Sequence, residues 1–135
     1  MGDDEAVLAA NRTFYGAFEA RDMDAMSDLW EHSDRAACVH PGWGSLAGWG
    51  AISASWFALF QNGENLQFII TNERVAVEGD VAWVSCDENI LADEVGGTVA
   101  AMNVVAASQR GDKDSLQRQM LPILLDAARE LRPLL

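Results

Sequence analysis

The sequence predicts an α+β fold, because apolar residues recur at helical spacing early in the chain and at strand-like spacing in its middle. The period changes from about 3.6 residues to about 2 after residue 65. Helical spacing returns within residues 111–135. Helices, then a sheet, then a helix indicate one domain over residues 1–135, with a body at 1–107 and a helical tail at 111–135.

Two helices in tandem are expected at the N-terminal end. Residues 3–20 carry apolar side chains at helical spacing, and Asp3 and Asp4 suit the positively polarised start of such a helix. Asp22 is a suitable N-cap for a second, short helix that would place Met26 on its inner side.

A strand and a third helix should follow. Residues 36–40 are apolar and short enough for a strand, which Pro41 would end. In residues 50–60, Trp56 and Phe60 lie four positions apart on one apolar stripe, which indicates a helix.

Three strands are expected next. Residues 66–78 and 81–91 are joined by Gly79-Asp80, a short polar break of the kind that links hairpin strands. A third run, residues 98–107, follows a break that contains glycine. These runs should pair as an antiparallel sheet.

The charge of the chain excludes some classes of partner. Acidic residues outnumber basic ones by 21 to 9, and the formal charge of −12 repels nucleic-acid phosphates and anionic lipids. No apolar run approaches the roughly 20 residues of a membrane-spanning helix, and the start MGDDEAV does not read as a signal peptide. We therefore expect a cytoplasmic protein that binds neither nucleic acid nor membranes.

The sequence carries no signal for a metal or a cofactor. It has no phosphate-binding glycine loop, no nucleophile elbow and no histidine pair at zinc-ligand spacing. Cys38 and Cys86 lie in apolar, strand-like segments and are expected to be buried free thiols. We predict no cofactor and no metal site.

Five segments occur in an order that is typical of a known family. They are FYGAFEARDMDAMSDLW (residues 14–30), CVHPGW (38–43), GWGAISASWFALF (48–60), WVSCDENI (83–90) and VAAMNVVA (99–106). In this order and spacing they resemble the SnoaL-like branch of the nuclear transport factor 2 (NTF2-like) superfamily. The resemblance covers most of residues 5–107.

The resemblance implies a cone-shaped fold, the cystatin-like roll. In this fold N-terminal helices pack on a strongly curved antiparallel sheet that encloses an apolar pocket. Members commonly form homodimers through the outer face of the sheet. The superfamily includes polyketide cyclases, ketosteroid isomerases, dehydratases, limonene epoxide hydrolases and noncatalytic association domains, so the fold alone selects no chemistry.

The chain departs from the family pattern after residue 107. Similar members continue with a last strand that bears Trp and His, whereas residues 108–135 contain neither. Losing that strand would expose the edge or face that it normally covers. We predict that a C-terminal helix within residues 111–135 replaces it, packed on the sheet of its own subunit or of a partner.

His40 and Asp87 are the candidate catalytic residues. His40 belongs to a family-like segment, where a pocket-facing imidazole could bond to a ligand or move a proton. Asp87 and Glu88 alternate to opposite faces of a strand, so one of them should meet the pocket. Asp87 shares its face with polar residues, which favours it. If that face is the outer one, Glu88 is instead the buried acid with the perturbed pKa.

Further candidates would bind the ligand, and they are Tyr15, Trp43, Trp56, Glu88 and Asn103. The tryptophans could stack on a flat ligand or belong to the core. Asn103 could bond to a ligand or serve as a structural amide. Ketosteroid isomerases use a tyrosine together with carboxyl groups, and Tyr15 is the one tyrosine of this chain, although the complete set is not matched.

The sequence therefore predicts a protein that binds a small apolar organic molecule. A cofactor-free lyase, isomerase or hydrolase step on an apolar, ring-containing substrate would fit. The alternative is a noncatalytic module for dimerisation or protein interaction. A homodimer is expected on either interpretation.

Overall fold

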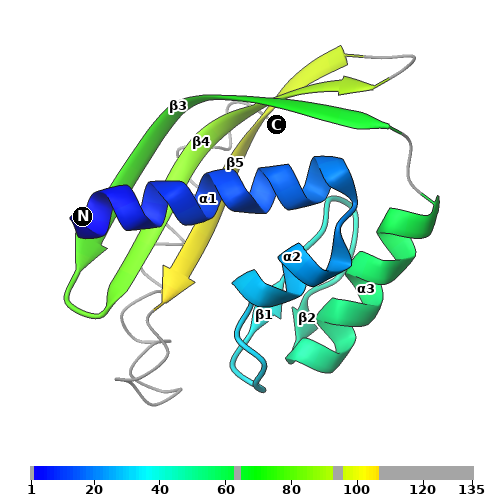
Figure 1. The fold of residues 1–135 in the computed structure, drawn as a ribbon, viewed down its shortest axis with the longest axis horizontal. Helices are drawn as coiled ribbons and strands as arrows, with labels where there is room; N and C mark the ends of the chain where they lie inside the picture. Colours follow the sequence, from blue (N-terminus) through cyan, green and yellow to red (C-terminus); the bar gives the residue numbers. More distant parts are fainter. Residues whose placement is uncertain (1, 63–64, 93–95, 107–135) are drawn as a thin grey trace.

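The computed structural model describes residues 2–62, 65–92 and 96–106. Its elements are α1 (Asp3–Ala20), α2 (Met23–Leu29), β1 (Ala37–Cys38), β2 (Leu46–Ala47), α3 (Trp49–Asn62), β3 (Leu66–Glu78), β4 (Val81–Ala92) and β5 (Gly96–Ala106). Figure 1 shows α1 running along the curved sheet of β3, β4 and β5, with α2, α3 and the two short strands grouped near the end of α1. The predicted α+β architecture, with helices packed on a curved antiparallel sheet, is confirmed.

α1 has the predicted boundaries, and α2 has the predicted N-cap. Asp22 Oδ1 accepts a hydrogen bond from Ala25 N at 3.1 Å and so caps α2. Arg21, with a φ of 53°, ends α1 in the left-handed conformation. The last turn of α1 also contacts the sheet, because Glu19 Oε1 accepts a hydrogen bond from Phe68 N at 2.5 Å.

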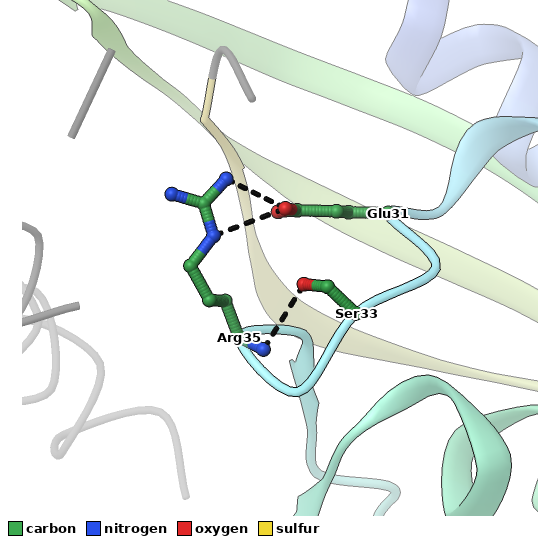
Figure 2. A network of polar contacts seen from close by, with 3 residues as sticks. All are labelled: Glu31, Ser33 and Arg35. Atoms are coloured by element: carbon green, nitrogen blue, oxygen red, sulfur yellow. Dashed lines mark hydrogen bonds and ion pairs between the residues drawn. The ribbon is translucent and has the colours of Figure 1, made fainter. Parts of the chain in front are cut away.

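A small polar network closes the turn between α2 and β1 (Figure 2). Arg35 Nε and Nη2 both donate to Glu31 Oε1, at 3.0 and 2.6 Å. The backbone N of Arg35 donates to Ser33 Oγ at 3.1 Å. β1 then pairs antiparallel with β2. These contacts fix the path of the chain just before His40.

The strand predicted over residues 36–40 is shorter than expected. Only Ala37 and Cys38 form β1, and His40 begins a turn in which Trp43 N donates to His40 O at 2.9 Å. Gly42 has a φ of 80°, so Pro41 and Gly42 occupy the central positions of a type II turn. The sequence pattern does not reveal β2, because a strand of two residues is too short to alternate.

The sheet has the predicted three antiparallel strands, in the order β3-β4-β5. The register of β3 against β4 shifts between Thr71 and Arg74, where Asn72 has a φ of 55°. Such a bulge bends a strand and re-aims its side chains, here those of Asn72 and Glu73. The bulge therefore bears directly on which side chains meet α1.

The core lies where the three helices meet, and its buried members are Ala17, Met26, Ala36, Ile52 and Trp56. Met26 and Ile52 are fully buried. Burying one such side chain stabilises the fold by about 1.5–3 kcal/mol. α3 starts at Trp49 and ends at Asn62, so it is longer than the predicted helix at both ends.

Of the two elements predicted toward the C-terminal end, the structure describes the strand but not the helix. β5 confirms the third strand and begins at Gly96, two residues earlier than predicted. The helix predicted within residues 111–135 lies outside the described residues. In the part of the chain that the structure describes, none of the helices combines the length and apolarity needed to cross a bilayer.

Candidate functional site

A buried tyrosine and a carboxyl group meet between α1 and the sheet. Tyr15 of α1 is 4% exposed, and its hydroxyl donates to Glu88 Oε1 of β4 with an O···O distance of 2.5 Å. The same hydroxyl lies 3.6 Å from Cys86 Sγ, which shares the inner face of β4 with Glu88. Because α1 and β4 are regular elements, the pair is held by rigid parts of the fold.

Burial changes the acid–base properties of both β4 side chains. Desolvation raises the pKa of Glu88, and the hydrogen bond from Tyr15 offsets part of that effect. Desolvation is also the main reason that the pKa of Cys86 is raised, so its thiol stays neutral at neutral pH. Glu88 therefore exchanges its proton closer to neutral pH than an ordinary glutamate does.

The bulge in β3 directs a second carboxylate toward α1. Glu73 Oε2 accepts a hydrogen bond from Asn11 Nδ2 at 3.4 Å, and Asn11 is buried. Glu73 also pairs with Arg12 at 3.5 Å, but the Arg12 side chain is 67% exposed, so this ion pair contributes little. The charge of Glu73 helps to raise the pKa of Cys86, after the larger effect of burial. Two carboxyl groups from the sheet thus meet a hydroxyl and an amide from α1.

Asp87 lies on the opposite face of β4 from Glu88. Its Oδ2 accepts a hydrogen bond from Asn72 Nδ2 at 2.7 Å, at the surface. Asn89 of the same face donates to Thr71 Oγ1 at 3.0 Å. The polar face of β4 is therefore the outer one, and the structure brings Asp87 to Asn72 rather than to His40.

His40 is the centre of a second buried polar cluster. It is 6% exposed, and its Nε2 lies 2.8 Å from Ser55 Oγ of α3. The Ser55 hydroxyl donates to Ile52 O at 2.6 Å. Burial lowers the pKa of His40, so the imidazole is neutral at neutral pH.

Both of the predicted ligand-binding tryptophans flank His40. The Trp56 ring is 2% exposed, and its centroid lies 4.8 Å from that of His40. The Trp43 ring is 44% exposed and lies 5.0 Å away. Trp56 also packs on Phe14, which in turn packs on Tyr15. Aromatic side chains therefore connect the two polar clusters.

Other expected features are placed as follows. Asn103 of β5 stands opposite Val84 of β4 in the register, and its ligand-binding role stays a prediction. Both cysteines are free thiols; Cys38 is half-buried and Cys86 is buried. His32 is exposed, and it stacks on a tryptophan of α3. Among the described residues, no three His, Cys, Asp or Glu side chains are grouped so that they could hold a metal ion.

Sequence reasoning missed Ser55 and Glu73. A signal for Ser55 was present, because it follows Ile52 by three positions and so shares the buried stripe of α3. No comparable signal existed for Glu73. Its direction depends on the bulge, which alternation along the sequence does not reveal.

Comparisons with known proteins give consistent matches. Residues 7–110 match the family model for the SnoaL-like domain. A solved structure of an NTF2-like protein from Streptomyces avermitilis, named as a dehydratase, is 40% identical with a TM-score of 0.70, covering 77% of this chain and 84% of that one. A Thiobacillus denitrificans protein, named as a calcium/calmodulin-dependent protein kinase type II association domain, is 32% identical with a TM-score of 0.63, covering 76% of this chain and 84% of that one.

A curated relative matches over a shorter part of its own length. F-box protein SKIP8 of Arabidopsis thaliana is 27% identical over 99 residues, which is 73% of this chain. The match covers 42% of that relative. This chain therefore spans less than half of the curated protein that it resembles.

Proposed function

We propose that this chain, which belongs to the SnoaL-like domain family of NTF2-like proteins, binds a small neutral organic molecule beside Tyr15 and Glu88 and that Glu88 moves a proton on it. One observation carries the proposal. The Glu88 carboxyl is desolvated between α1 and β4, with a tyrosine hydroxyl bonded to it at 2.5 Å. Perturbed carboxyl groups of this kind are concentrated at functional sites.

The charges around the pair favour a neutral ligand. Glu88 and Glu73 both approach α1, and every arginine whose burial the structure describes is exposed or only partly buried. An anionic ligand would meet these carboxyl groups and the net charge of −12, and no buried cation among the described residues would compensate. Aromatic rings at Phe14 and Phe68, centred 5.1 and 5.4 Å from that of Tyr15, favour an apolar ring-containing molecule.

Glu88 suits proton transfer because its raised pKa makes the ionised form a stronger base than an ordinary glutamate. In an isomerase step the carboxylate would take a proton from the carbon beside a carbonyl and return it to another carbon of the same molecule. In a lyase step the same proton would leave with a departing hydroxyl group as water, while a carbon–carbon double bond forms. Neither step needs a cofactor.

The test begins with a ligand. Native mass spectrometry of freshly purified protein, with a thermal-shift screen of ketones, epoxides and steroids, should find a bound or stabilising neutral molecule. For a ketone that binds, NMR in D₂O should show exchange of the hydrogens beside the carbonyl. Glu88→Gln should slow this exchange by about 10²- to 10⁴-fold. Asp87→Asn is the matched comparison, and equal losses in both variants would refute the role of Glu88.

A noncatalytic association module is the second candidate, and the outer face of the sheet favours it. Ile69 is 50% exposed and Leu91 46% exposed on that face. The 32% identical relative is named as an association domain. In this case the protein would form a homodimer through Ile69 and Leu91. Analytical ultracentrifugation of Ile69→Lys should then show monomers, and an unchanged sedimentation coefficient would count against this surface.

A further inference from the structure

We infer that His40, Ser55 and Trp56 form the recognition site for a polar group of the ligand. In this site the Trp56 indole N–H donates to a carbonyl oxygen, and His40 Nδ1 accepts from a neighbouring hydroxyl. The inference rests on the proposed function, since it names the class of ligand: a neutral hydroxyketone. It is carried by contacts at residues other than Tyr15 and Glu88.

The hydrogen bonds of Ser55 determine where the His40 proton lies. A serine hydroxyl has one hydrogen, and that of Ser55 is donated to Ile52 O at 2.6 Å. Ser55 Oγ can then only accept at its 2.8 Å contact with His40 Nε2. Nε2 therefore carries the proton, and Nδ1 of the neutral ring carries a lone pair.

That lone pair has no strong partner among the described residues. Cys38 Sγ lies 3.9 Å from Nδ1 and 3.8 Å from Nε2, so the sulfur faces the ring rather than one nitrogen. A thiol is in any case a weak donor. Nδ1 is therefore available to a ligand hydroxyl, which is a stronger donor.

Trp56 supplies the complementary donor. Its Nε1 is buried and has no hydrogen-bond partner among the described residues, although the side chain is 2% exposed. Leaving a buried donor unpaired costs free energy, and such a group calls for an explanation. A carbonyl oxygen of a bound molecule would pair it. The ring centroids of Trp56 and His40 lie 4.8 Å apart, so the unpaired donor and the imidazole belong to one cluster.

The surroundings select a neutral group. Burial keeps the imidazole of His40 uncharged, and no arginine whose burial the structure describes lies in the core. Trp43, which is 44% exposed, contacts His40 and places the cluster near the surface. Ser55 is a positioning residue here, because it acts on the ligand only through the tautomer of His40.

The experiment uses the full chain and defined probes. ¹H–¹⁵N NMR would follow the indole N–H signals and the His40 ring nitrogens while 2-hydroxycyclohexanone, cyclohexanone, methylcyclohexane or cyclohexanecarboxylate is added. We expect 2-hydroxycyclohexanone to shift the Trp56 indole signal and His40 Nδ1. Cyclohexanone should shift the indole signal alone, and the other two probes should shift neither. Trp49→Phe and Trp43→Phe assign the neighbouring indole signals without altering the core residue Trp56.

Ser55→Ala tests the positioning role, with Ser53→Ala as the matched control. Ser53 is on the same helix and makes the same kind of bond, to Gly50 O at 3.1 Å, but it is only partly buried and this bond is exposed. Ser55→Ala should move part of the His40 proton to Nδ1 and weaken 2-hydroxycyclohexanone binding by about 2- to 10-fold. Ser55→Thr should restore the tautomer. Unchanged ring-nitrogen signals in Ser55→Ala would overturn the role of Ser55.

The outcomes separate this inference from the proposed function. Probe-induced shifts at Tyr15 and Glu88 without shifts at Trp56 and His40 would overturn the inference and leave the proposed function standing. Shifts at Trp56 and His40 alone, together with an unchanged exchange rate in Glu88→Gln, would overturn the proposed function and leave the inference standing. If the Trp56 indole signal shows contact with a bound water and does not shift with any probe, the inference of a recognition site is overturned.

Discussion

The two faces of β4 place neighbouring residues in opposite environments. On the inner face Val84 and Cys86 are buried, and Glu88 bonds to the buried hydroxyl of Tyr15. On the outer face Asp87 bonds to Asn72 at the surface. Two acids that are adjacent in sequence thus differ in solvation, partner and accessible chemistry. The difference follows from the period-2 alternation of a strand together with the helix that covers one of its faces.

The contrast teaches that polar neighbours in a strand are a poor guide to a buried site. Asp87 has polar residues on its face because that face is solvated, while Glu88 shares its face with apolar residues. A carboxyl group among apolar neighbours is desolvated, which raises its pKa and makes it the more useful acid or base.

The largest effect expected from this contrast is on stability. Val84→Asp would bury a carboxylate without a partner at a position with 0% exposure, and should lower the free energy of unfolding by about 3–5 kcal/mol. Ser85→Asp, one residue further on the outer face, should cost less than about 1 kcal/mol. Urea unfolding followed by circular dichroism measures both. Comparable losses would contradict the assignment of the two faces.

A smaller effect is expected when each acid loses its hydrogen-bond partner. Tyr15→Phe leaves the Glu88 carboxyl buried without the hydroxyl and should lower the free energy of unfolding by about 1–3 kcal/mol. Asp87→Ala removes only the surface bond to Asn72 and should change the free energy of unfolding by no more than about 0.5 kcal/mol. The same denaturation assay compares the two. A larger loss of stability in Asp87→Ala than in Tyr15→Phe would contradict the conclusion that the inner face holds the more important hydrogen bond.

The smallest effect is a pH dependence that belongs to Glu88. Because the pKa of Glu88 is raised in the folded state, the unfolded chain ionises first as pH rises. The contribution of Glu88 is full below the ordinary glutamate pKa of about 4.3 and is lost as pH rises through the folded-state pKa. Relative to Glu88→Gln, which does not titrate, the wild type should therefore lose stability across that window. Unfolding free energies of both proteins, measured from about pH 4 to about pH 8, test this.

Tyr15→Phe sharpens the pH prediction. The Tyr15 hydrogen bond lowers the pKa of Glu88, so its removal should raise that pKa further. NMR titration of the Glu88 side-chain carbon reports the change directly. A pKa of Glu88 that fell in Tyr15→Phe would show that the hydroxyl stabilises the neutral acid instead.

Most of the fold was predictable because its signals are local. The Asp22 cap, the apolar stripe around Trp56 and the alternation of residues 66–78 each lie within one element. The predicted strand at residues 36–40 was too long, because His40 is the first residue of a type II turn. The partner of His40 could not be read locally, since Ser55 comes from a different element.

The sequence by itself determined the class of fold, the order of its elements and the fact that Asp87 and Glu88 face opposite ways. These depend on spacing, caps and turns, which act over a few residues. Only the tertiary structure decided which face meets α1, that Tyr15 pairs with Glu88, and that Ser55 fixes the tautomer of His40. Such choices depend on residues far apart in the chain, whose desolvation and hydrogen bonding arise only when the elements pack.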